Sequence, residues 1–426
     1  MSVQSAIETP DTVLGTPLSS VVAVTAGQVA PPSPAECRDL LERLRLVGDG
    51  RSDTGRTHPV AAVLTLAAAA VVGGMRSFTA IAGWVADTPA KLLEQLYARC
   101  GQPPAVPSKC TIWRVVTGAD PAAVDAVVGA WLAQRAGIDI GVDPPVGSEP
   151  PGVSGPVDRA DRDVSPRAVL AVDGKRVRGA VDAEGNAPHL LAAATHDDAL
   201  VLAQVDVHHK TNEIPMFAPL LDTIDIAGML ITADCLHTQR AHARYLHARD
   251  ADFVFCVKDN QPGLFAALDA LAWTDVPVAH TATDRGHGRV ETRTLQVMTA
   301  PPGLPFPHVS QVFLVERTVT DLAGASLSNV ANLGVTSLNA NRGDPALIAE
   351  TVRGQWSIES LHWIRDTLYR EDDSHAHTKS GPRVMAALRN LAIGALRLSG
   401  RTDIAEATRW ATRKMERPFT ILGLAT

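Results

Sequence analysis

Two aspartates stand where short apolar runs end. Asp173 follows the run of residues 168–172, and Asp234 follows the run of residues 228–233. Such runs predict buried strands, and an acidic side chain at the end of a strand reaches the edge of a sheet, where ligands and metals bind. Two aspartates from neighbouring strands can bridge one divalent cation, since Mg²⁺ prefers oxygen ligands. The alternative is that each aspartate caps a helix or begins a turn, because Asp173-Gly174 is a common turn pair.

A third carboxylate would be needed to hold a second ion, and Glu359 is the candidate. Helical spacing places five residues on one face: Trp356, Glu359, Trp363, Asp366 and Arg370. A helix face with a carboxylate between two tryptophans differs in composition from an ordinary solvent-exposed face. The alternative is an aromatic stripe packed in the core, with Glu359 paired to Arg353 or Arg370.

The elements that must position these acids form an α/β pattern. Short apolar or alternating runs predict strands over residues 168–172, 190–195, 200–206, 228–233 and 252–257. Helices are expected at residues 213–221 and 238–249. Three adjacent strands followed by alternating helix and strand predict a mixed sheet with helices on its faces.

Residues 260–345 interrupt this alternation. Strand patterns at residues 289–298, 311–319 and 330–336 predict a mainly β insertion. Helical patterns return at residues 344–369 and 383–412. Residues 351–426 carry twelve Lys and Arg against eight Asp and Glu, so recurring arginines here either line a phosphate-binding face or form a solvated helix surface.

The part of the chain before the sheet has three regions. Residues 1–34 are rich in Ser, Thr and Pro and predict a disordered tail. Residues 35–137 are helical in pattern, with an amphipathic start at 35–47, Pro59 before an apolar helix at 60–72, and Ser108 as an N-cap. Residues 138–166 are rich in Pro and Gly and predict a linker.

Composition excludes several classes of protein. The 426 residues are 46% hydrophobic, which is enough for a sizeable core. The formal net charge of −7 argues against a histone-like or ribosomal protein, although a basic patch can sit on an acidic chain. The five cysteines are scattered without a CxxC, so we expect a reducing cytoplasm. The longest apolar run, residues 60–75, is too short to span a bilayer, so no membrane association is expected.

Beyond these patterns, the chain resembles the DDE transposases of bacterial insertion sequences, in the H-repeat-associated branch linked to Rhs elements. Short motifs carry the resemblance, in the family's order and spread over nearly the whole chain after the tail. They are Asp173-Gly174-Lys175 with Arg178, Lys210-Thr211-Asn212-Glu213-Ile214, Asp234 with Gln239, Lys258-Asp259-Asn260-Gln261, His287-Gly288-Arg289 with Glu291 and Arg293, and the segment 356–363 with Asp366 and residues 369–372. Residues 35–132 resemble the domain that precedes the catalytic core in this family, so the helical domain at 35–137 is expected to serve either DNA-end binding or dimerisation.

Four positions depart from the family's pattern. Cys235 replaces the usual Ala after the second aspartate, and Gln355 stands where His usually precedes the first Trp. Ser360 replaces an Asn beside the glutamate, and Arg365 replaces an aliphatic residue. None of these changes removes a carboxylate.

The resemblance implies a ribonuclease H-like catalytic domain over residues 167–426, with the β-rich insertion at 260–345 and a helical C-terminal region. It implies that Asp173, Asp234 and Glu359 bind Mg²⁺, with Mn²⁺ as a possible substitute, and that Asp366 is the rival for the third position. Residues expected to contact DNA are Lys175, Arg178, Lys210, Gln239, Lys258, His287, Arg289, Arg353, Trp356 and Trp363.

The expected function is metal-dependent cleavage of DNA at the ends of an insertion sequence, followed by strand transfer into target DNA. The partners are then the element ends with their inverted repeats and the target DNA, and acting on two ends implies at least a homodimer. Two alternatives remain open at this point. One is a nuclease on the same fold that never joins ends, and the other is a decayed, transposase-derived DNA-binding protein.

Overall fold

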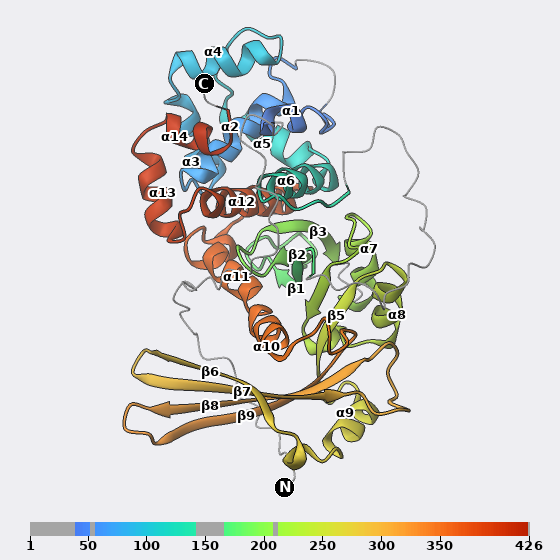
Figure 1. Cartoon of the computed structure of the whole chain (residues 1–426). Coiled ribbons are helices and arrows are strands. Elements are labelled where there is room, and N and C mark those ends of the chain that lie inside the picture. Colours follow the sequence, from blue (N-terminus) through green and yellow to red (C-terminus); the bar gives the residue numbers. More distant parts are fainter. Residues whose placement is uncertain (1–38, 52–55, 142–165, 208–211, 425–426) are drawn as a thin grey trace. The chain divides into compact units, whose positions relative to one another are not determined.

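The computed structural model describes residues 39–51, 56–141, 166–207 and 212–424 (Figure 1). The expected tail at 1–34, most of the linker at 138–166, and Lys210 lie outside these residues. The described chain divides into two compact units. Unit 1 holds residues 166–172 and Ile226–Trp356. Unit 2 holds residues 39–141, Asp173–Asp225 and the part after Ser357, each within the described ranges.

Nine strands of the described chain form one mixed sheet, in the order β3-β2-β1-β4-β5-β9-β8-β7-β6. Their bounds are β1 Val169–Arg176, β2 His189–Thr195, β3 Val201–Val207, β4 Leu230–Ala233, β5 Asp252–Val257, β6 Val278–Gly286, β7 Arg289–Thr299, β8 Gln311–Asp321 and β9 Ser326–Thr336. β1 pairs in parallel with β4, and β4 pairs in parallel with β5. The antiparallel pairs are β2–β3, β5–β9, β8–β9, β7–β8 and β6–β7. The predicted mixed sheet with helices is confirmed.

Unit 1 is built on the parallel strands β4 and β5. All four residues of β4 are buried, as expected for a strand covered on both faces. The antiparallel strands β6–β9 form a long ribbon (Figure 1). The helices of this unit are α8 Arg240–Ala248, α9 Pro262–Asp269 and α10 Pro345–Gly354, with short 3₁₀ turns η3 Cys235–His237 and η4 Trp273–Asp275. Ile348 of α10 packs into the apolar cluster of Leu230, Val254 and Phe313.

Unit 2 is mainly helical. Its helices are α1 Leu40–Leu44, α2 Val60–Val72, α3 Phe78–Ala86, α4 Ala90–Arg99, α5 Lys109–Gly118, α6 Pro121–Arg135, α7 Phe217–Leu221, α11 Ser357–Thr367, α12 Gly381–Leu398, α13 Ile404–Thr412 and α14 Glu416–Ile421, with η2 Ile214–Met216 and η5 Glu371–Asp373. α12 is buried along most of its length and packs against α2, α5, α6, β3 and α13. The helices that come before and after the sheet in sequence therefore share one core.

Helix starts in unit 2 follow local capping chemistry. The Ser108 side chain accepts a hydrogen bond from the main-chain N–H of Thr111 and begins α5, as predicted. Ser77 caps α3 in the same way. No single helix in the described ranges is long and apolar enough to cross a membrane; α5 and α6 pass that test only as a pair, which is bent by 90°.

Two regions predicted to be helical each contain two helices in the structure. The helix expected over 344–369 is broken at Gln355 and Trp356, between α10 and α11, because Gly354 favours termination at this point. The region expected to be helical over 383–412 contains α12 and α13, separated around Gly400, whose φ of +80° is a left-handed conformation typical of a helix end. A further strand, β6, was not predicted; it is an exposed edge strand rich in polar residues.

Candidate functional site

The ends of β1 and β4 are in register within unit 1. Val172 and Ala233 are partners in the parallel ladder, and the next residue of each is an aspartate. The expectation that Asp173 stands after the end of its strand is wrong, because β1 continues through Asp173 to Arg176 alongside β2. The boundary between the two units falls inside β1, so Asp173 belongs to unit 2 and Asp234 to unit 1.

Asp234 sits in a turn that its own side chain stabilises. The main-chain N–H of His237 donates to Asp234 Oδ1 at 3.4 Å, so the aspartate caps η3 while its side chain remains exposed. Asn260 donates to the carbonyl of Cys235, which ties this turn to the segment after β5. Burial raises the pKa of the Cys235 thiol to about 11, so this thiol is neutral at pH 7 and is a poor metal ligand.

Gln355, the first residue after α10, connects the two strands just before their aspartates. Its Nε2 atom donates to the carbonyl of Val172 at 3.4 Å. Its Oε1 atom accepts a hydrogen bond from the hydroxyl of Thr232, which lies on β4. All three residues belong to unit 1. Gln355 is one of the four residues that depart from the family's pattern, and its side chain links β1 to β4.

In unit 2, His362 is the neighbour of Asp173. The Nδ1 atom of His362 lies 3.5 Å from Asp173 Oδ2, and the His362 side chain is 13% exposed. Burial, aided by the charges of Arg365 and Lys175, lowers the pKa of His362 to about 3. The imidazole is therefore neutral at pH 7. His362 and Glu359 are three residues apart on α11, so their side chains leave the helix on the same side.

The tryptophans around Glu359 are on the surface. Trp356 is 64% exposed and Trp363 is 41% exposed, so the alternative of a buried aromatic stripe is wrong. The continuous helical face is also wrong, because Trp356 precedes α11 and Arg370 follows it in a left-handed conformation. Glu359 itself is exposed on α11.

The two arginines considered as partners of Glu359 form ion pairs with other carboxylates. Arg353 lies 2.8 Å from Asp284, and Arg370 lies 2.7 Å from Asp373. Both ion pairs join groups that are at least a third exposed, so each contributes little to the free energy of unfolding.

Lys175 is a buried ion-pair partner. Its Nζ atom lies 2.6 Å from Asp366 Oδ2 and 3.8 Å from Asp372 Oδ1, and its side chain is 8% exposed. Burial raises the pKa of Asp366, and the hydrogen bond from Lys175 opposes that shift. The Arg178 side chain, in contrast, is 81% exposed; its guanidinium group lies 3.9 Å from Asp372, and its main-chain N–H donates to Asp372 Oδ1 at 3.1 Å.

Gly174, between Asp173 and Lys175, has a steric reason to be glycine. A Cβ atom at this position would lie 2.1 Å from Oε1 of Glu213. Glu213 is held in turn by His189 Nε2, 2.7 Å away. Glu213 belongs to the motif that contains Lys210, so the structure connects two of the motifs that the sequence singled out.

The remaining residues expected to contact DNA lie in unit 1. Lys258 and His287 are exposed, and His287 is in the turn between β6 and β7 with a φ of +49°. Arg289 begins β7. Gln239 donates to the carbonyl of Leu236 and accepts a hydrogen bond from Gln261.

A buried charge cluster near the end of α11 explains a further family departure. Glu371 is fully buried and forms ion pairs with Arg365 and Arg389, whose guanidinium nitrogens lie 2.7 and 2.8 Å from its carboxylate oxygens. Desolvation raises the pKa of Glu371, but the two arginines outweigh it and hold this pKa at about 2. Arg365, where the family usually has an aliphatic residue, therefore neutralises a buried carboxylate.

Within the described chain, no group of three or more His, Cys, Asp or Glu side chains is clustered closely enough to hold a metal ion. Asp173 and Glu359 belong to unit 2, and Asp234 belongs to unit 1. Sequence reasoning missed His362 and Gln355 as neighbours of the acidic residues. The spacing of His362 from Glu359 was the available signal for the first, whereas the contacts of Gln355 depend on strands more than a hundred residues away.

Comparisons with known proteins place these residues in context. A family model described as "Transposase DDE domain" matches residues 165–394, more than half of the chain, and one described as "DDE_Tnp_1-associated" matches residues 41–132. "Putative transposase YncI" of Escherichia coli O157:H7 is 24% identical over 84% of this chain and 87% of its own length. "H repeat-associated putative transposase YhhI" of Escherichia coli K12 is 24% identical over 85% of this chain and 91% of its own length.

One solved structure, a piggyBac transposase synaptic complex with hairpin DNA, aligns with a TM-score of 0.34 and 11% identity. The alignment covers 61% of this chain and 54% of that one. A likeness this weak carries no structural argument.

Proposed function

Because this chain belongs to the DDE transposase family, in the branch of the H repeat-associated proteins, we propose that it cuts DNA at the ends of an insertion sequence and joins the freed ends to target DNA. The observation that carries the proposal is the register of Val172 with Ala233. Adjacent parallel strands lie about 4.8 Å apart, so strands in this register deliver their next residues, Asp173 and Asp234, to one edge of a sheet.

We assign the third acidic position to Glu359. It is exposed on α11, and α11 also carries His362, the neighbour of Asp173. Asp366, the rival on the same helix, is paired at 2.6 Å with the buried Lys175 and has a structural role. The assignment gives a ribonuclease H-like arrangement of two aspartates on adjacent strands and one glutamate on a helix.

The donor chemistry fits a hard divalent cation. Asp173, Asp234 and Glu359 offer carboxylate oxygens, which suit Mg²⁺ or Mn²⁺. Burial lowers the pKa of the neighbouring His362 to about 3, so its imidazole is neutral at pH 7 and adds no positive charge beside Asp173. When bound, the metal would neutralise charge on the scissile phosphate and lower the pKa of an attacking water.

The protein's own contribution is positioning. Gln355 holds the strand segments that precede both aspartates, and Gly174 leaves room for Glu213 beside the first of them. Carboxylates in fixed positions would hold the divalent metal, which supplies the positive charge that orients the phosphate for in-line attack, first by water at the element end and then by the freed 3′-hydroxyl at the target. This sequence requires no covalent protein–DNA intermediate. Its partners are element ends with inverted repeats and target DNA in the bacterial cytoplasm, held by at least two copies of the chain.

The test is cleavage of a DNA duplex that carries an element end. Asp173→Ala and Asp234→Ala should each reduce cleavage at least about a hundredfold while leaving DNA binding intact, because these residues act on the transition state. Glu184→Ala removes a carboxylate from an exposed turn and is the matched control, which should cleave normally. Metal-dependent cleavage retained by both aspartate variants contradicts the proposal.

Strand transfer is tested separately by supplying a precleaved end and a target plasmid. Joined products support a transposase. Hydrolysis with no joined product would instead identify a nuclease built on the same acidic residues.

A further inference from the structure

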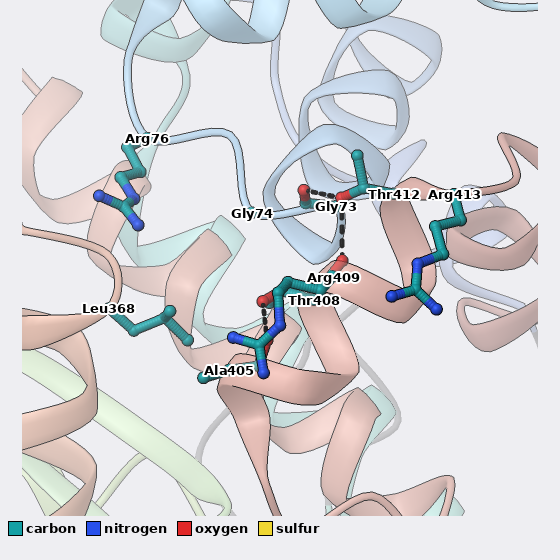
Figure 2. Close-up of a pocket in the computed structure, with 9 residues that line it drawn as sticks. All are labelled: Gly73, Gly74, Arg76, Leu368, Ala405, Thr408, Arg409, Thr412 and Arg413. Atoms are coloured by element: carbon teal, nitrogen blue, oxygen red, sulfur yellow. Dashed lines mark hydrogen bonds between the residues drawn. The ribbon is translucent and has the colours of Figure 1, made fainter.

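A pocket of about 550 Å³ lies within unit 2, and none of the acidic residues described above lines it (Figure 2). It is formed by the turn after α2, by one side of α13 and by Leu368, which follows α11. Three of its lining residues, Arg76, Arg409 and Arg413, carry guanidinium groups. No carboxylate is among its lining residues.

The three arginines are exposed and available. Among the residues that the structure describes, none of the three forms an ion pair with a carboxylate. Three like charges around one hollow repel each other unless an anion joins them, so an open pocket of this composition suits a phosphate group.

The other arginines of the C-terminal helices have partners inside the protein. Arg383 pairs with Asp125 and Asp206, and Arg389 pairs with Glu371. Three more are held by other groups: Arg397 by the carbonyl of Asp198, Arg401 by Glu406 and the Trp410 ring, and Arg417 by the same ring. Arg409 and Arg413 therefore differ in their partners from the other arginines of the C-terminal region, a difference that the sequence alone does not show.

The backbone of the pocket is fixed by specific contacts. Gly74 has a φ of +82°, and a Cβ atom there would lie 3.4 Å from the Thr408 side chain, so this turn approaches α13 closely. The hydroxyl of Thr412 donates to the carbonyl of Gly73 at 2.5 Å (Figure 2). These contacts hold Arg76, two residues after Gly74, on the same pocket as the arginines of α13.

The pocket also has a defined relation to α11. Leu368 lines the pocket and continues the helix, since its N–H donates to the carbonyl of Ile364. Leu368 is nine residues beyond Glu359, which corresponds to about 14 Å along a helix axis. Along a duplex parallel to α11, that length would span about four base pairs at 3.4 Å each.

We propose that this pocket binds a backbone phosphate of duplex DNA, at a point several base pairs from the phosphate that is cut. The inference rests on the proposed function, because it takes the anion to be DNA bound by a transposase. Contacts of this kind fix the register of the protein on the duplex and carry no sequence information.

The experiment measures how DNA affinity depends on salt, with EDTA present so that no cleavage occurs. The probe is a generic duplex of about 30 base pairs, and affinity is measured by fluorescence anisotropy from about 50 to 200 mM salt. Arg409→Gln combined with Arg413→Gln should lower the slope of log K against log salt by about one for each phosphate that the protein no longer neutralises. Affinity at low salt should fall by about tenfold or more.

Three further variants make the result specific. Arg409→Lys combined with Arg413→Lys keeps the charge and should retain the slope. Lys91→Gln, at an exposed lysine of α4 that does not line the pocket, removes a positive charge elsewhere and should bind as the unmodified chain does. Glu184→Gln, on an exposed turn outside the pocket, should also keep the full slope. The substituted arginines are exposed, so Tm should stay unchanged.

Equal slopes for the double Gln variant and the unmodified chain overturn the pocket inference and leave the proposed function standing. A decrease in affinity for Lys91→Gln as large as for the double Gln variant also overturns it, because net charge alone would then explain the effect. Failure of the unmodified chain to bind duplex DNA contradicts both the pocket and the proposed function.

Discussion

Lys175 and Asp366 form a close ion pair, with 2.6 Å between Nζ and Oδ2, although 191 positions separate them in the sequence. Lys175 is 8% exposed, so its ammonium group depends on this carboxylate, with Asp372 farther away at 3.8 Å. An acid committed to a buried lysine is a poor candidate for a metal ligand. The pair therefore separates the roles of two acids, Asp366 and Glu359, that share one helix.

The first prediction compares substitutions of these two acids. Glu359→Gln should reduce cleavage about a hundredfold and change the free energy of unfolding by less than about 0.5 kcal/mol, because Glu359 is exposed. Asp366→Asn should destabilise by about 2 kcal/mol, because it weakens the charge-assisted bond to Lys175. Urea unfolding and a cleavage assay measure the two effects. The opposite pattern, a stable but inactive Asp366→Asn, would make Asp366 the third metal ligand.

The second prediction concerns metal binding without catalysis. Mg²⁺ or Mn²⁺ that binds only the folded chain should raise Tm, by the equivalent of about 2.7 kcal/mol at a hundred times Kd. Asp173→Asn and Asp234→Asn should each remove this rise if both residues hold the metal, as we propose from the register of Val172 with Ala233. EDTA should reverse the rise in the unmodified chain.

Glu184→Gln, on an exposed turn, is the control for this measurement and should show the full rise in Tm. An equal rise in all variants means that the metal binds elsewhere, and the assignment of both aspartates would then be wrong.

The third prediction tests the role of Gln355 as a positioning residue. Gln355→Leu removes the bonds to Val172 and Thr232 and should cost about 1 kcal/mol of stability. The strand ends that precede both aspartates would be held less firmly, so kcat should fall about tenfold while Kd for DNA is unchanged. Gln355→Glu, which keeps an acceptor for the Thr232 hydroxyl, should retain part of the rate. A weakened Kd with unchanged kcat would indicate that Gln355 contacts DNA instead.

Local patterns were sufficient for much of the sheet. The apolar runs before Asp173 and Asp234 correspond to β1 and β4, because parallel strands are buried on both faces and read as continuous apolar segments. The strand β6 was missed for the converse reason. Its residues are mostly exposed, and the ladder with β7, not burial, makes it a strand.

Side-chain environments were harder to predict. Lys175 follows an aspartate and a glycine and looks like a surface cation, yet it is buried because Asp366 lies against it from a distant helix. The break between α10 and α11 was hidden by an unbroken helical spacing from Trp356 to Arg370. The choice among basic residues likewise depends on tertiary partners, as the difference between Arg389 and Arg409 shows.

The last prediction uses the buried pair of arginines around Glu371. Its pKa is held at about 2, below the ordinary value of 4.5, because Arg365 and Arg389 outweigh the desolvation that raises it. A carboxyl with a depressed folded-state pKa stabilises the protein above its unfolded pKa, and this contribution is lost as the pH falls from about 4.5 towards about 2. Urea midpoints should therefore fall steeply over that window.

Glu371→Gln should cost about 3 to 5 kcal/mol at neutral pH, because it leaves two buried guanidinium groups without a counter-charge. The same variant should show a flatter dependence of stability on pH below 4.5 than the unmodified chain, since the titrating group is gone. Glu184→Gln is the exposed control and should follow the unmodified curve. An unchanged acid limb in Glu371→Gln would mean that other carboxylates, and not this buried cluster, set the acid stability of unit 2.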